Sequence, residues 1–112
     1  MDRDPLQNLG KLPKTFQRLV EKYPDIEGAH QQMAAAVEAI GALDERTAAL
    51  VKIGICAGAG LETATKSHVH RALEKGVEPK AIEQAIFLSI NTIGFPNAMA
   101  AWQWARDAME KR

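Results

Sequence analysis

The segment LETATKSHVHRALEK, residues 61–75, has the periodicity of a helix that packs by one side. One stripe carries charged or polar residues at i, i+4 spacing, which is typical of a solvated surface: Glu62, Lys66, His70 and Glu74. The opposite side is mainly apolar: Leu61, Ala64, Thr65, Val69, Ala72 and Leu73. Gly76 follows the last turn, where a left-handed glycine commonly ends a helix. We therefore predict a helix over 61–75, with His68 as the polar residue on its inward side.

Five other segments also have helical character, with proline, glycine or aspartate at their ends. They cover about 13–23, 25–40, 45–58, 79–93 and 97–111. Pro24 ends the first of these, and Asp25 and Asp44 are placed to cap the next two. Residues 94–96, Gly-Phe-Pro, form a corner before the last. No alternating strand pattern occurs, so the sequence predicts an all-α fold.

The composition is that of one small globular domain. The 112 residues hold 14 Lys plus Arg and 14 Asp plus Glu, and this zero net charge argues against a nucleic-acid partner. No run of about 18 apolar residues would span a membrane, and the N-terminal stretch has no signal-peptide core. We therefore predict a single six-helix domain over 13–112 after an arm over 1–12. We expect it in the cytoplasm, without membrane or nucleic-acid partners.

Two of the predicted helices have no clear polar side, which suggests that subunits associate. The segment TAALVKIGICAGAG at 47–60 is apolar nearly all round except for Lys52, and the helix from Pro79 becomes so after Ala85. A chain of this size would struggle to bury both helices alone. We therefore expect a homo-oligomer, in which Trp102 and Trp104 are candidate interface anchors.

His68 has two interpretations as a polar residue on an apolar helix side. It is either a neutral core histidine bonded to a neighbouring acceptor or a general acid/base, since histidine titrates near neutral pH. Ser67 and Thr65 are placed to orient a substrate or the imidazole, and Glu62 to assist from a subunit boundary. His68 and His70 lie about 200° apart on the helix and cannot share one ion, so we expect no metal and no cofactor.

Three stretches of the C-terminal part follow one another in a characteristic order. They are LDERTAALVKIGICAGAG at 43–60, SHVHRALEKGVEPKAIEQAI at 67–86 and GFPNAMAAWQWA at 94–105. The most specific part is His68, Ala72 and Gly76 at steps of four, followed by the Gly-x-Pro corner. Together they resemble the carboxymuconolactone decarboxylase superfamily, which includes alkyl hydroperoxidase D-like proteins. The resemblance implies an all-helical fold that assembles as a homotrimer or homohexamer.

Other residues occupy the positions that peroxidase members of the superfamily use for thiol chemistry. The resemblance places their Cys-x-x-Cys pair at Leu61 and Ala64 and their proton-relay glutamate at Ala49. The single cysteine, Cys56, lies on an apolar helix, where burial would raise its pKa. A thiol peroxidase is therefore disfavoured, because no thiolate pair is present to attack a peroxide and resolve the product.

Decarboxylase members of the superfamily also lack the cysteine pair, so the resemblance leaves a decarboxylase-like lyase open. In that branch a carboxylate usually stands one turn before the histidine, where this chain has Ala64. Such an enzyme also needs cations to hold an acidic substrate, and Arg71 and Lys66 are the candidates.

Three functions remain as alternatives. In the first, His68 performs acid/base chemistry on a small organic acid or lactone, with Ser67 and Glu62 as further catalytic candidates. In the second, the chain is a non-catalytic oligomeric helical protein that binds a small molecule or a partner. The third is residual peroxidase activity through Cys56 alone, which the missing thiols disfavour.

Overall fold

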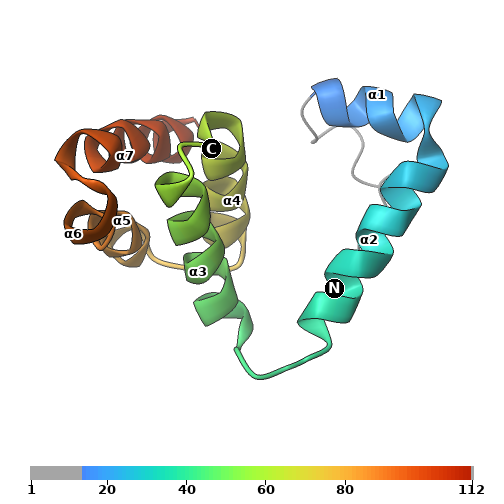
Figure 1. Cartoon of the computed structure of the whole chain (residues 1–112), viewed down its shortest axis with the longest axis horizontal. Helices are drawn as coiled ribbons and strands as arrows, with labels where there is room; N and C mark the ends of the chain where they lie inside the picture. Colours follow the sequence, from blue (N-terminus) through green and yellow to red (C-terminus); the bar gives the residue numbers. More distant parts are fainter. Residues whose placement is uncertain (1–13, 112) are drawn as a thin grey trace. The chain divides into compact units, whose positions relative to one another are not determined.

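The computed structural model describes residues 14–111, and every regular element in that range is an α-helix (Figure 1). The all-α fold expected from the sequence is confirmed. The predicted arm over 1–12 lies outside the described residues. The chain divides into two compact units between Ala42 and Leu43, which are described separately, and the single domain over 13–112 stays a prediction.

The first unit is a hairpin of two helices, α1 (Lys14–Lys22) and α2 (Pro24–Glu38). Pro24 lies in the first turn of α2, where its missing N–H removes no helical hydrogen bond. The sequence predicts Asp25 as the cap of α2, but it lies inside the first turn, and Tyr23 takes the cap position without a side-chain hydrogen bond. Helix α2 therefore begins before the cap predicted at Asp25, because proline is well suited to the first turn of a helix.

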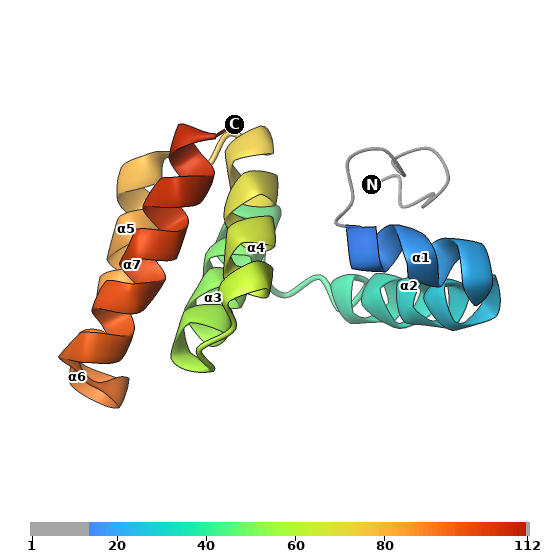
Figure 2. The same ribbon diagram turned by 90° about the horizontal axis from the view of Figure 1, so that it is seen from above.

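The second unit holds five helices: α3 (Glu45–Gly58), α4 (Glu62–Glu74), α5 (Pro79–Phe87), α6 (Ile90–Ile93) and α7 (Phe95–Glu110). α4 and α5 each pack against both α3 and α7, so the four longer helices form a bundle (Figure 2). α6 is a single turn that packs on α7. No helix within 14–111 combines the length and the apolar character needed to cross a membrane.

The helix predicted over 79–93 is present in two pieces. Ser89 Oγ donates a hydrogen bond to the carbonyl oxygen of Ile86 at 2.6 Å, and Thr92 Oγ1 donates to that of Ser89 at 3.0 Å. Such side-chain bonds compete with the backbone bonds of a helix, which accounts for the interruption between α5 and α6. Gly94 then adopts φ +102°, a conformation that favours glycine, and makes the expected corner into α7.

The core of the second unit is aliphatic, and α7 meets it through small side chains. The largest buried residues are isoleucine and valine: Ile53, Val69, Ile82 and Ile86. The buried side of α7 is made of alanine: Ala98, Ala101, Ala105 and Ala108. Trp102, a candidate interface anchor, packs within this unit: its Nε1 donates to Glu83 Oε2 at 2.9 Å, and its ring meets Phe87 edge-on. Close packing of the four longer helices around an aliphatic core therefore stabilises the unit.

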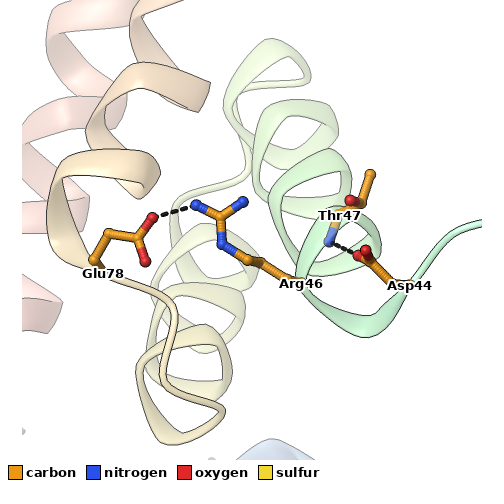
Figure 3. A network of polar contacts seen from close by, with 4 residues as sticks. All are labelled: Asp44, Arg46, Thr47 and Glu78. Atoms are coloured by element: carbon orange, nitrogen blue, oxygen red, sulfur yellow. Dashed lines mark hydrogen bonds and ion pairs between the residues drawn. The ribbon is translucent and has the colours of Figure 1, made fainter.

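Asp44 caps α3, as the sequence predicts, and an ion pair lies near the same helix end (Figure 3). The backbone N–H of Thr47 donates to Asp44 Oδ1 at 2.7 Å and holds the pKa of Asp44 below its usual value. Arg46 donates to Glu78 at the start of α5, and this bond lowers the pKa of Glu78. The two contacts fix the start of α3 and tie it to the start of α5.

Asp44→Asn removes the titrating carboxyl group but keeps an oxygen that accepts the bond from Thr47. Because the folded-state pKa of Asp44 is lowered, its stabilisation is present above the usual value of 3.8 and is lost as pH falls through the folded-state pKa. We expect the free energy of unfolding of the wild type to fall relative to Asp44→Asn across that acid range. Tryptophan fluorescence during urea unfolding measures this, since Trp102 and Trp104 both lie in α7. A difference that stays constant from neutral pH to about pH 3 would contradict the assignment.

Candidate functional site

His68 lies on α4 at the edge of the core. Its side chain is half-buried, and the adjacent Val69 is fully buried. One turn earlier, Thr65 is fully buried and its Oγ1 has no hydrogen-bond partner. Residues three apart lie about 60° from one another around a helix, so this hydroxyl is on nearly the same side as His68. Because Thr65 is fully buried, its hydroxyl faces neighbouring protein groups and is not exposed to a substrate.

The other two predicted catalytic residues point elsewhere on α4. Ser67 is half-buried and lies about 100° around the helix from His68. Glu62 lies about 120° from His68, and its carboxylate accepts a bond from Lys66 Nζ at 3.0 Å on the exposed side. A single helix therefore does not gather the three side chains at one point, and the roles of Ser67 and Glu62 stay predictions.

Arg71 is the cation that shares a side of α4 with His68. It follows His68 by three residues, about 60° around the helix, and its side chain is exposed. Its positive charge acts on the thiol of Cys56 on α3, which places the guanidinium on the side where α4 packs against α3. His68 and Arg71 thus share a side of α4, three residues apart.

Cys56 is buried on α3, with 7% of its surface exposed. Burial raises the pKa of its thiol, and the charge of Arg71 opposes that effect only in part. The thiolate is the nucleophilic form of cysteine, so a raised pKa leaves this group poorly reactive near neutral pH. The prediction that burial would raise its pKa is confirmed.

A groove of about 490 Å³ runs along the second unit between α3 and the α5–α6 segment. Its walls are largely small or aliphatic: Leu50, Val51, Gly54, Gly58, Ala81 and Ala85. Arg46 lines it at the start of α3, and Ser89 and Thr92 line it on the α6 side. His68 is not among the lining residues. We did not predict this groove, and the available signal was the pair of glycines four residues apart on one helix side.

Metal ligation has no support in the part of the chain that the structure describes. Over 14–111, no three histidine, cysteine, aspartate or glutamate side chains gather in an arrangement that would hold an ion. The groups on this side of α4 that could act on a substrate are the half-buried imidazole of His68 and the exposed guanidinium of Arg71.

Comparison with protein-family models adds one finding to this geometry. The model described as "Carboxymuconolactone decarboxylase family" matches residues 24–107, which is more than half of the chain. The match includes α2 and the helices that carry His68, Arg71 and Cys56. Comparisons with curated proteins and with solved structures returned no match.

Proposed function

This chain belongs to the carboxymuconolactone decarboxylase family, and we propose from that premise that it performs acid/base chemistry on a small organic acid or lactone. His68 is the proton-transferring group, and Arg71 holds a carboxylate of the substrate. The observation that carries the proposal is their shared side of α4, three residues apart. Thr65, which is fully buried one turn before His68, would orient the imidazole.

The pairing of these groups suits the decarboxylation of a lactone that carries carboxylates. A guanidinium binds a carboxylate through charge-assisted, two-pronged hydrogen bonds. The bond between the ring carbon and a second carboxylate then breaks, its electron pair passes into the unsaturated lactone, and CO₂ leaves. The imidazolium of His68 donates a proton to the carbon beside the lactone carbonyl in the enolate that results, and the imidazole regains a proton from water.

Thiol chemistry is a poor alternative for the same chain. The positions of the peroxidase cysteines are occupied by Leu61 and Ala64, and the single thiol of Cys56 is buried with a raised pKa. A lone buried thiol also has no resolving partner within the chain. Acid/base chemistry through His68 needs neither a cysteine pair nor a reactive Cys56 thiol.

Arg71→Gln tests the carboxylate-binding role. With carboxymuconolactone as the probe and CO₂ release as the readout, we expect KM to rise about tenfold or more with a smaller change in kcat, because a charged hydrogen bond to the substrate is lost. Lys66→Gln is the matched control, since Lys66 bonds Glu62 and lies about 200° from His68 around α4. Equal KM values for the two variants, or no CO₂ release by the wild type, would contradict the proposal.

The groove favours a second candidate, a non-catalytic helical protein that binds an apolar surface. Its lining is mainly apolar, and it does not include His68. The two candidates differ in whether any reaction depends on His68.

We further propose that the chain is a homo-oligomer, either a homotrimer or a homohexamer. Large apolar side chains that are more than half exposed support this, and they occur in both units: Ile26, Met33, Val37 and Ile40 before residue 43, and Ile55, Leu88 and Phe95 after it. Exposed apolar groups in such number are typical of surfaces that another chain covers.

A further inference from the structure

We propose that the groove between α3 and the α5–α6 segment receives helix α2 of a second copy of this chain. The inference rests on the self-association proposed above and names the two surfaces that meet. Four observations on the separate units carry it: the outward apolar stripe of α2, two glycines on α3, the charges of both surfaces, and their lengths.

Within the first unit, α2 turns a polar side inward and an apolar side outward. Glu27 is 1% exposed, and its Oε1 accepts a bond from Gln31 Nε2 at 2.7 Å. Ile26, Met33 and Val37, which together we call the α2 stripe, lie about 100° around the helix from Glu27, and each is more than half exposed. A helix normally buries its apolar stripe, so the α2 stripe requires a partner outside its own hairpin.

The groove has glycines that nothing else in the structure requires. Gly54 and Gly58 are one turn apart on α3, both line the groove, and neither has a positive φ. A Cβ added at either position would meet no atom within 4 Å. Each glycine costs an exposed helix about 1 kcal/mol relative to alanine. Their presence is explained if another helix approaches α3 closely at this place, because only glycine leaves room for backbone contact.

The charges of the two surfaces do not oppose their contact. The α2 stripe has no ionisable side chain, and the acidic Glu27 is buried inside the hairpin. Among the described residues that line the groove, Arg46 is the one that carries a charge, and Glu78 pairs with it. Docking of the stripe therefore leaves no unpaired charge in the contact, and the zero net charge of the whole chain does not oppose close association of copies.

The lengths of the two surfaces also agree. The α2 stripe extends from Ile26 to Val37, and the lining on α3 extends from Arg46 to Gly58. They cover eleven and twelve residue steps, or roughly 17 and 18 Å at about 1.5 Å per residue. Leu88, which is 69% exposed, lines the groove opposite α3 and would cover the seated helix from its other side.

Light scattering after size-exclusion chromatography of the full chain tests both surfaces. Val37→Glu places a charge in the α2 stripe, and Gly54→Leu fills the groove from a position where an added Cβ meets no atom within 4 Å. We expect each to raise the dissociation constant of the oligomer at least about thirtyfold, the effect of losing one hot spot. Gly28→Leu is the matched control, because it adds the same side chain to open space on the side of α2 away from the stripe, and we expect assembly to be unchanged.

Disulfide capture between two tagged chains shows which surfaces meet. Both chains carry Cys56→Ser, so that no native thiol is present. One chain also carries Val37→Cys, and the other carries a cysteine at Val51, Gly54 or Leu88 in turn. The two chains are refolded together with an added oxidant. A cross-link between the differently tagged chains is expected. A single chain that carries both cysteines serves as the comparison. If a cross-link forms only within that chain, and not between differently tagged chains, the proposal is overturned. If the wild type is oligomeric but no cross-link forms and Gly54→Leu assembles normally, this inference fails alone; a monomeric wild type removes the proposed self-association itself.

Discussion

Replacing His68 with glutamine is expected to lower kcat for CO₂ release from carboxymuconolactone at least about 100-fold, with little change in KM. General acid/base groups contribute about 10²–10⁴ to an enzymatic rate. Glutamine keeps a comparable size and can form hydrogen bonds, but it cannot transfer a proton near neutral pH. His68 is half-buried on α4, so the substitution leaves the fully buried core residues in place.

The chain supplies a matched control for this substitution in His70. It lies on the same helix, is also half-buried, and points about 200° away from His68, toward a hollow with Leu73, Glu74 and Lys111. We expect His70→Gln to leave kcat within about twofold, because surface changes away from a site have small effects. Unchanged activity in His68→Gln, or equal losses in both variants, would remove His68 from the mechanism.

The second large effect concerns the core of the second unit. Ile53 is fully buried on α3 and belongs to the cluster shared by four helices, whereas Ile55, two residues later on the same helix, is 63% exposed. We expect Ile53→Ala to lower the free energy of unfolding by about 2–5 kcal/mol through lost burial and the cavity it leaves. Ile55→Ala should cost less than about 1 kcal/mol, because little apolar surface returns to water.

Urea unfolding followed by tryptophan fluorescence measures both variants, since Trp102 and Trp104 report the second unit. Comparable losses from the two substitutions would mean that Ile53 is not a central core residue, or that Ile55 is buried against another copy. Repeating the measurement at a tenfold lower protein concentration separates these two explanations, because only an interface contribution depends on concentration.

The helices were predictable where local chemistry decides them. Asp44 caps α3 through Thr47, and Gly76 ends α4 at φ +84°, as the residue types indicate. Both signals act within one turn of the chain, so they do not depend on tertiary packing. The interruption between α5 and α6 was not predicted, because the bonds of the Ser89 and Thr92 hydroxyls compete with a helix that is otherwise apolar and continuous.

Features that depend on packing between segments were less predictable. The periodicity of α2 groups Ile26, Met33 and Val37 on one side, but periodicity does not tell which neighbour covers that side. The structure shows that α1 packs on α2 while this side stays exposed and Glu27 is buried. Which side of α2 faces α1 is decided by packing within the hairpin, so periodicity alone does not predict it.

The candidate site was predictable in part. The periodicity of 61–75 predicted His68 on the inward side of α4, where the structure leaves it half-buried, and the apolar segment around Cys56 indicated a buried thiol. The unbonded hydroxyl of Thr65 and the position of Arg71 beside the α3–α4 seam depend on how the two helices pack, so they required the structure. Glu62 was expected to assist from a subunit boundary; its carboxylate bonds Lys66 within the chain, and its role stays a prediction.

The central claim is that this member of the family uses proton transfer and not thiol chemistry. Cys56→Ser tests it most directly, because the chain has one cysteine and the variant has none. Rates of CO₂ release from carboxymuconolactone and of alkyl hydroperoxide consumption with dithiothreitol are measured side by side for wild type and variant. The account predicts unchanged CO₂ release and no peroxide consumption above the uncatalysed rate in either protein. Peroxide consumption by the wild type that disappears in Cys56→Ser would contradict it.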